Sequence, residues 1–583
     1  MKKILALLLA LVLALGLLSA CGSSEPADTG TKEAEKEPEK EAEPANEEEP
    51  AGEEPAAEEG DLEPITFTYF SADMNNTNWD TPVGNAITKA TGVTLECSYP
   101  VGSVGAAGDD IALMIASGEY PDMIYAKGGE SDLYAAGAFI DMTNYNGVNL
   151  IEEYGPNIKK MYGDELKKLE WGEGDHGIYQ LSAYEVGATP LSSPGSCQLQ
   201  YKVLEWNDWK YPTTIAEYED IIKRYGEAHD WTCDDGSKMY GLTISASDWH
   251  WMITLGNPAG FIADAEPDNG QWLVDEDMNV IYKHTTEAEH DYFEWLNRMY
   301  LEGILDPDFA TQTDEDYLAK IASGQSIGIL DSSWHYNNAC KTCIADGRIG
   351  DTMCGLPVTF YEGDKCPMMM YQGLTVGVGI GITVSCKDPI RAIKFLDFLC
   401  SDEGQVLYQW GVEGEQYFVD ENGNRYRTEE EINTANTDPD YSKNTGIGNY
   451  VGFPRYGSGA TDSTGQSYTT STRQSVIDLY NDIEKAACEA WGVEMLIDIL
   501  PPTSDFEQPP YSPIWAYSTP QEFSEMQSKL DEYAQIGLVT VTRAAEGTFE
   551  EEWQKMQETF EELGVHDAEA AFTQFVYNKV NGL

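Results

Sequence analysis

Strand-like and helix-like segments alternate at the start of the globular region, and this alternation restricts the fold more than any other feature. The predicted strands are residues 65–70, 93–98 and 123–126, and the predicted helices between them are residues 80–91 and 109–117. Pro82 stands near the start of the first helix and Gly92 directly after it, as helix-entry and helix-stop residues do. The resulting β-α-β-α-β order predicts a parallel sheet and an α/β fold.

The first twenty residues have the layout of an export signal. Lys2 and Lys3 are followed by an apolar run over residues 4–17 and by small residues up to Ala20. This is the order of a signal peptide, with a basic start, a short apolar stretch and a cleavage site. The apolar run is too short for a membrane span, which needs about 20 residues. Residues 1–20 are therefore predicted to be a signal peptide.

The residues at the predicted cleavage site are Leu18-Ser19-Ala20-Cys21. They resemble the lipobox of bacterial lipoproteins, in which the cysteine is acylated, for example with palmitate, and becomes the mature N-terminus. The resemblance implies lipidation of Cys21 and a protein anchored by lipid alone to the extracellular face of the cell membrane. An ordinary signal peptide with a chance cysteine is the alternative.

Residues 21–61 are predicted to form a disordered acidic linker. From Gly22 to Glu63 the chain has 17 Asp or Glu against 3 Lys, no aromatic residue, and Leu62 as the only large aliphatic residue. Such a segment buries too little apolar surface to offset the entropy of ordering, and its charge extends it. It is interpreted as a solvated tether.

The globular region begins near Pro64 and is acidic as well. The whole chain has a formal net charge of -66, of which the tether contributes -14. A negative field of this size argues against nucleic acid and anionic membrane surfaces as partners. It does not identify the ligand.

Several motifs resemble, in order, those of the extracellular solute-binding proteins of bacterial ABC importers, the family that includes maltose-binding protein. The stretch Ala116 to Ile124, with Gly118, Pro121 and Asp122, is similar to the family's ASG-x-x-PD segment. The later matches are Tyr201–Tyr218, Tyr300–Phe309, Gly324–Trp334, Asp388–Gly404, Tyr408–Tyr417 and Gly547–Val580, the last two being similar to the oligosaccharide-type lipoprotein subgroup. Trp410 stands where that subgroup more often has Phe.

The resemblance implies a two-lobed α/β fold of the type II periplasmic-binding-protein class, with a ligand cleft between the lobes. The predicted lobes are residues 62–185 plus 325–380 for lobe I and residues 186–324 plus 381–583 for lobe II. It further implies a monomer that captures a carbohydrate, most simply an oligosaccharide, by lobe closure and delivers it to the transmembrane permease subunits of an ABC transporter.

Sugars present apolar C–H faces and a rim of hydroxyls, so aromatic and carboxylate side chains near the family's cleft positions are the predicted ligand contacts. These residues are Trp334, Trp249, Trp79, Tyr125, Asp331, Asp248, Trp251, Tyr371 and Trp515, with Asn75, Asn78 and Gln372 as further candidates. For each aromatic residue, burial in the core is the alternative.

No catalytic residue, metal or cofactor is predicted. The chain lacks G-x-S-x-G, H-E-x-x-H and phosphate-loop motifs, and the histidine pairs His284/His290 and His229/His250 have no metal-ligand spacing. A glycoside hydrolase needs only two carboxylates in a cleft, so a polysaccharide-acting surface enzyme stays open as a less favoured reading. A ligand-sensing binding protein for a peptide or other polar solute is the main alternative.

Two weaker metal patterns are present. Cys340 and Cys343 have zinc-like local spacing, and Cys354 and Cys366 could complete four ligands, but the paired C-x-x-C repeat of zinc ribbons is missing. Disulfides and free buried thiols are the alternatives for the ten cysteines after Cys21. The stretch 234–238 lacks the full carboxylate alternation of a calcium loop, so calcium is not expected there.

Overall fold

The computed structural model describes residues 63–73, 78–100, 106–172, 174–267, 269–370, 373–438, 440–514 and 521–582. The chain divides into two units, residues 1–56 and 57–583, and every described residue belongs to the second. The predicted signal peptide, the lipidation site Cys21 and the acidic linker lie outside the described residues. None of the described helices combines the length and the apolar composition that a bilayer span requires.

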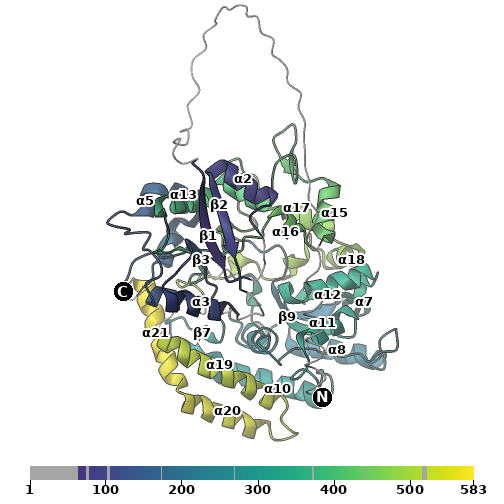
Figure 1. Cartoon of the computed structure of the whole chain (residues 1–583). Coiled ribbons are helices and arrows are strands. Elements are labelled where there is room, and N and C mark those ends of the chain that lie inside the picture. Colours follow the sequence, from purple (N-terminus) through teal and green to yellow (C-terminus); the bar gives the residue numbers. More distant parts are fainter. Residues whose placement is uncertain are drawn as a thin grey trace, which may run out of the picture. The chain divides into compact units, whose positions relative to one another are not determined.

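The first of two main sheets has five strands, and Figure 1 labels β1, β2 and β3 of this sheet. Their spatial order is β2 (Val93–Ser98), β1 (Ile65–Ser71), β3 (Met123–Tyr125), β11 (Gly379–Ile382) and β4 (Leu181–Ser182). Strand β1 runs parallel to both β2 and β3, whereas β11 is antiparallel to β3 and β4. The connecting helices are α2 (Pro82–Thr91) and α3 (Ala106–Ser117). The predicted β-α-β-α-β order is therefore confirmed.

Local sequence explains the ends of α2. The hydroxyl of Thr81 accepts a hydrogen bond from the backbone N–H of Gly84. Pro82 occupies the first turn, where backbone N–H groups have no acceptor within the helix, so the N–H that proline lacks costs no hydrogen bond. Gly92 ends the helix with φ of 71°, a left-handed conformation that costs glycine little. The chain then enters β2 directly, which places that strand beside β1.

The second sheet is antiparallel and has the order β10 (Met353–Leu356), β6 (Gly195–Gln200), β9 (Gly328–Ser332). Residues 240–243 lie alongside β9 through parallel bridges of Tyr240 with Ser326 and of Thr243 with Ile329. The helices α7 (Tyr201–Trp206), α8 (Ile215–Ala228), α10 (Glu287–Leu301), α11 (Asp314–Ala322) and α12 (Ser333–Ala345) follow in this part of the chain.

Strand pairing after residue 325 does not follow the predicted lobe ranges, whose boundaries stay a prediction. Strands β9 and β10 were expected in lobe I, yet both pair with β6 in the second sheet, whereas β11 and the segment after it return to the first. Helices α13 (Pro389–Cys400) and α14 (Asp402–Trp410) contact α5 (Leu150–Tyr154), α6 (Pro156–Tyr162) and α2. Pairing between strands more than 130 residues apart depends on tertiary packing, which strand patterns do not encode.

The last three helices are α19 (Gln521–Thr542), α20 (Phe549–Leu563) and α21 (Val565–Asn581), and they pack against α10 and each other. On α20, Trp553, Met556 and Phe560 are buried, whereas Leu563 is 36% exposed.

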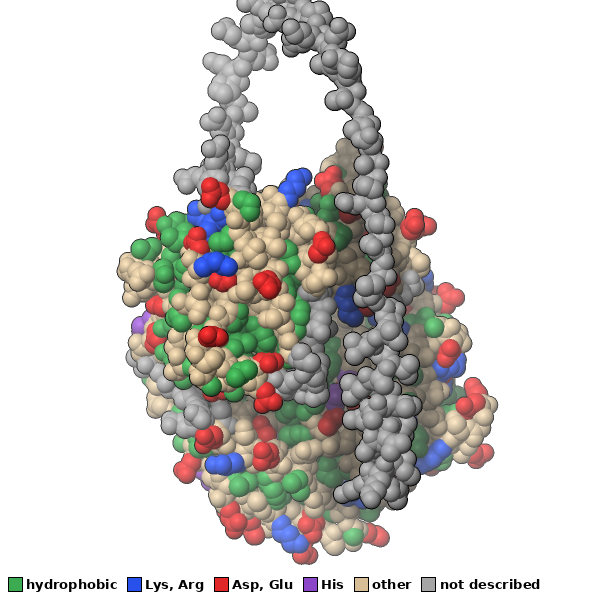
Figure 2. All heavy atoms as spheres, in the orientation of Figure 1, with side chains coloured by type: hydrophobic (Ala, Val, Ile, Leu, Met, Phe, Trp, Pro, Cys, Tyr) green, Lys and Arg blue, Asp and Glu red, His purple; other side chains and the backbone are tan. Residues whose placement is uncertain are grey.

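The other helices, and the short strands, complete the described region. The helices are α4 (Glu130–Ala135), α9 (Asn257–Ala259), α15 (Glu429–Thr437), α16 (Tyr441–Thr445), α17 (Arg473–Leu479) and α18 (Asp482–Trp491). The strands are β5 (Glu185–Val186), β7 (Trp272–Val274), β8 (Val280–Tyr282), β12 (Phe418–Val419), β13 (Arg425–Tyr426) and β14 (Arg455–Tyr456). Asp and Glu side chains are scattered over the visible face in Figure 2, in keeping with the acidic composition.

Candidate functional site

Two tight turns beside the second sheet present tryptophans to solvent. After the Thr243 bridge, Asp248 accepts hydrogen bonds at Oδ1 from the backbone N–H of His250 (2.9 Å) and pairs with its Nδ1 (2.7 Å). This Asx turn directs His250 inward, where it is 8% exposed, and leaves Trp249 40% exposed. The loop therefore separates a buried imidazole from an exposed indole on adjacent residues.

The end of β9 produces the same arrangement from another part of the chain. Strand β9 ends with the buried Asp331, and α12 begins at Ser333. Trp334 in the first turn of α12 is 58% exposed, whereas the next residue, His335, is 8% exposed. The change from strand to helix thus places one aromatic ring outside and the next inside.

Trp249 and Trp334 form an exposed aromatic pair. Their ring planes differ by 3° and their centroids are 6.2 Å apart. A sugar ring does not fit between them, because two carbon contacts of about 3.5–4.0 Å each need a wider gap. The pair therefore offers only its outward-facing, solvent-exposed indole surface to an apolar partner. Asp248, whose side chain is 45% exposed, adds a carboxylate beside this surface.

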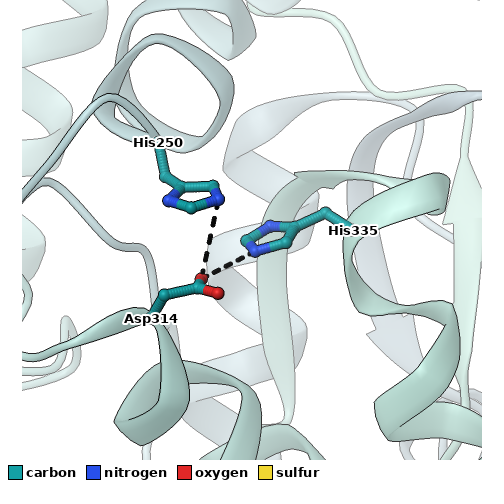
Figure 3. Close-up of side chains that lie close together, drawn as sticks. All are labelled: His250, Asp314 and His335. Carbon is teal, nitrogen blue, oxygen red and sulfur yellow. Dashed lines mark hydrogen bonds and ion pairs between the residues drawn. The ribbon is translucent and has the colours of Figure 1, made fainter. Parts of the chain in front are cut away.

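Two histidines and an aspartate lie next to the aromatic pair, where the ring of Trp249 contacts that of His250 and the ring of Trp334 contacts that of His335. The rings of His250 and His335 stack at 4.5 Å with 12° between their planes. Asp314, at the start of α11, approaches both rings, with Oδ1 2.7 Å from Nε2 of His335 and 3.9 Å from Nε2 of His250. Figure 3 shows the three side chains converging from three separate stretches of chain.

Asp331 holds His335 in place rather than facing solvent. Its carboxylate accepts hydrogen bonds from Tyr317 Oη (2.8 Å) and the backbone N–H of Ser332 (2.7 Å), and it pairs with Nδ1 of His335 (2.9 Å). Burial raises the pKa of Asp331 despite these partners. For His335, burial lowers the pKa, but the hydrogen bonds with Asp331 and Asp314 outweigh it and leave the pKa above its ordinary value.

The structure places three other predicted contact residues in the core. Trp79 is 5% exposed, packs against Tyr450 with centroids 4.9 Å apart, and donates its indole N–H to Thr88 Oγ1. Tyr125 at the end of β3 and Trp251 are 3% and 4% exposed. Among the predicted contacts, only Trp249, Trp334, Asp248 and Asp331 are brought together, and the side chain of Asn78 instead accepts a hydrogen bond from the backbone of Asp80. Tyr371, Gln372, Trp515 and Asn75 lie outside the described residues.

The ten cysteines after Cys21 are all free thiols, and eight of them are buried. Cys340, Cys354 and Cys366 belong to three different hydrophobic clusters. The cysteines are thus spread through the cores, and the four residues suggested by spacing do not form one ligand set. Asp235 in the stretch 234–238 accepts hydrogen bonds from the backbone and hydroxyl of Ser237.

A cavity of about 920 Å³ lies at the carboxyl ends of β1 and β3 in the first sheet. Its lining is mostly alanine and isoleucine from α3 and from residues 126–136, with an ion pair between Lys127 and Asp73 (2.8 Å) at its edge. The carboxyl ends of parallel strands are common ligand-binding positions, and this volume is that of typical ligand sites. The predicted strand ends were the only sequence signal that could have located it.

His250, Asp314 and His335 were missed as a group from the sequence. They are 21 to 85 residues apart along the chain and come together only through the pairing of β9 with residues 240–243 and the packing of α11 on α12. Each histidine does follow a predicted contact tryptophan directly, which is the one local signal that could have drawn attention to it.

Comparison with known proteins gives both a family and a set of similar folds. Residues 83–412, more than half of the chain, match the family model described as bacterial extracellular solute-binding protein. Curated protein sequences yield no significant match.

Solved structures with a similar fold cover nearly the whole folded region. An HMO-binding solute-binding protein of Bifidobacterium longum infantis is 14% identical, with a TM-score of 0.64 over 88% of this chain and 99% of the other. The Streptococcus pneumoniae substrate-binding protein FusA, in complex with fructo-nystose, is 16% identical, with a TM-score of 0.62 over 89% and 100%. The alginate-binding protein AlgQ2 is 17% identical, with a TM-score of 0.58 over 88% and 98%. These likenesses confirm the predicted two-lobed fold.

Proposed function

Because the chain belongs to the bacterial extracellular solute-binding protein family, we propose that it is the substrate-binding component of an ABC importer and captures an oligosaccharide. The observation that carries the choice of ligand is the pair of exposed, parallel indoles of Trp249 and Trp334. Parallel aromatic faces match the flat C–H faces of consecutive sugar rings, and Asp248 is positioned to accept a sugar hydroxyl. Solute-binding proteins of similar fold that bind HMO, fructo-nystose and alginate support the same ligand class.

The binding mechanism follows from a two-lobed fold in which each lobe offers part of a site. The aromatic pair lies beside the second sheet, and the cavity lies at the carboxyl ends of β1 and β3 in the first sheet. A ligand that contacts both lobes stabilises the closed form relative to the open form by the contacts that only closure makes. The closed form is then the state that the permease subunits recognise. No bond in the ligand is broken, and the protein acts as a binding protein rather than an enzyme.

Anchoring completes the proposal. Acylation at Cys21 would tether the folded unit to the extracellular face of the membrane through the acidic linker of residues 21–61. The protein would act as a monomer, with lipid as its only membrane contact. The alternatives are a sensor with the same fold that binds a peptide or other polar solute, and a surface enzyme that acts on polysaccharides.

A thermal-shift screen of the purified chain against oligosaccharides, monosaccharides and short peptides tests the ligand class. A ligand that binds only the native state adds about 2.7 kcal/mol of stability at a concentration of 100 times its dissociation constant. A shift with one glycan series that is lost in Trp334→Ala and kept in Trp206→Ala would support the proposal. Trp206 is the control because it is another solvent-exposed tryptophan (40%, against 58% for Trp334) that lies apart from the aromatic pair, against Tyr225 and His229.

The other outcomes are equally informative. A shift with peptides alone would overturn the carbohydrate assignment and leave a solute-binding protein for another ligand. Release of shorter sugars from the glycan during the assay would overturn the binding-only mechanism and favour the enzyme alternative.

A further inference from the structure

The side chains of His250, Asp314 and His335 have the composition and spacing of a metal site. One ligand atom from each lies within 4.8 Å of the other two, and both histidines are buried. Two imidazole nitrogens and one carboxylate oxygen form a donor set that zinc accepts in proteins, with a fourth position for water or a substrate atom. The residues come from a loop, from the start of α11 and from the start of α12, so the site would join three segments (Figure 3).

The surrounding carboxylates orient both imidazoles as metal-binding proteins do. His250 pairs through Nδ1 with Asp248 (2.7 Å), and His335 pairs through Nδ1 with Asp331 (2.9 Å). When Nδ1 carries the proton shared with a carboxylate, the lone pair of the neutral ring is at Nε2. The Nε2 atoms of both rings face the same carboxylate, that of Asp314. Such carboxylate–histidine pairs are the usual support of histidine ligands to zinc.

The charge of the cluster also favours a bound cation. Three carboxylates, those of Asp248, Asp314 and Asp331, surround two imidazoles. Within the described part of the chain, the ion pairs recorded for these carboxylates are with the two histidines alone. The three carboxylates are three potential negative charges in a partly buried place. A divalent ion would offset two of them.

We propose that His250 Nε2, His335 Nε2 and Asp314 bind a divalent transition metal ion of the zinc class. At zinc–ligand distances of about 2.0–2.1 Å, neighbouring ligand atoms of a tetrahedral site lie about 3.3 Å apart. The observed separations from Asp314 Oδ1, 2.7 Å and 3.9 Å, lie on either side of that value. Binding therefore needs shifts of less than 1 Å in these two separations, together with a turn of the His250 ring out of its near-parallel stack on His335.

Metal binding would order the aromatic pair. Trp249 and Trp334 are the residues directly before the two histidine ligands, so an ion that joins His250 to His335 also fixes the two indoles relative to each other. This consequence rests on the proposed function, because it concerns glycan affinity. The metal site itself does not depend on the nature of the ligand.

The test is a titration of the chelator-treated, full-length protein with Zn²⁺ alone, monitored by isothermal titration calorimetry. A second titration, with Co²⁺, is monitored by absorption spectroscopy. We expect one saturable site without thiolate-to-cobalt charge transfer, because the proposed donors are nitrogen and oxygen. The substitutions His250→Gln, His335→Gln and Asp314→Asn should each weaken binding by at least about 100-fold. Asp248→Asn, which removes an orienting partner, should weaken it by about 10- to 100-fold.

His290→Gln is the matched control. His290, on α10, also contacts two carboxylates, those of Asp291 and Glu550. It lies where α10 packs against α20 and is not part of the proposed metal site. This variant should bind zinc as the wild type does. The metal site is overturned if the wild type shows no saturable binding below millimolar zinc, if the variants with native melting profiles bind like the wild type, or if cobalt reports thiolate ligation. Zinc binding without any effect of glycans would keep the metal site and overturn the carbohydrate proposal.

Discussion

Trp334→Ala should weaken ligand binding with little loss of stability. Trp79→Ala should lower stability and leave ligand binding unchanged. Truncation of a buried Trp or Phe costs about 3–5 kcal/mol of unfolding free energy. Trp334 is 58% exposed and buries less than half of its surface, so its loss should cost less than about 2 kcal/mol. If its indole face contacts the glycan, the affinity should fall at least about tenfold, which is about 1.4 kcal/mol of binding free energy.

Trp79 has the opposite environment. It is 5% exposed, stacks among Tyr450, Phe395 and Phe453, and its indole N–H is satisfied by Thr88. Trp79→Ala should therefore lose about 3–5 kcal/mol of stability and leave the glycan affinity of the folded molecules unchanged.

Chemical denaturation and calorimetric titration with the glycan identified in the screen measure both quantities on each variant. The reasoning would be refuted if Trp334→Ala kept wild-type affinity, or if it destabilised the protein as much as Trp79→Ala does. A loss of affinity in the folded Trp79→Ala protein would show that the core assignment of Trp79 is wrong.

Three further outcomes are expected. Burial, with the nearby charge of Glu289, raises the pKa of Asp264 to about 8. The stability that this carboxyl contributes is therefore present below about pH 4 and lost as pH rises through 8. Relative to the wild type, the melting temperature of Asp264→Asn should rise between pH 5 and pH 9, and a constant difference between the two proteins at all pH values would contradict this. Thr81→Ala removes the side chain that accepts the hydrogen bond of the Gly84 N–H at the start of α2, together with the hydrogen bond to Tyr450 Oη (2.8 Å). The unfolding free energy should fall by about 1–2 kcal/mol in a urea titration, and an unchanged midpoint would be the contrary result. The eight buried thiols should react with a maleimide only after denaturation, as counted by mass spectrometry, and rapid native labelling of any of these eight would count against the described packing.

Local sequence was sufficient for the elements of the first sheet and for the late helices. Pro82 and Gly92 delimit α2 through backbone chemistry that acts over a few residues, and Asp388 caps α13 in the same way. The alternation of strands and helices needs no partner to be recognised, so the parallel strands β2, β1 and β3 were predicted correctly, although the same sheet also contains β11, which is antiparallel to both of its neighbours. The ordered motifs likewise predicted the solute-binding family, which residues 83–412 match.

The aromatic residues show where sequence reasoning stops. Trp79, Trp251 and Trp334 were all predicted ligand contacts, yet the first two are buried and the third is exposed. Which face of a turn an indole occupies depends on the elements that pack against it, and those come from distant parts of the chain.

The sequence by itself determined the α/β class, the extents of the local elements and the family, because backbone conformation and hydrophobic periodicity are short-range properties. Only the tertiary structure decided which sheet receives β9, β10 and β11, and that His250, Asp314 and His335 meet next to Trp249 and Trp334. Those arrangements depend on strand pairing and helix packing between residues that are from 21 positions apart (Asp314 and His335) to 255 positions apart (Tyr125 and Ile380). Contacts over that separation leave no periodic signal in the chain, so the candidate site emerged only when the sheets were assembled.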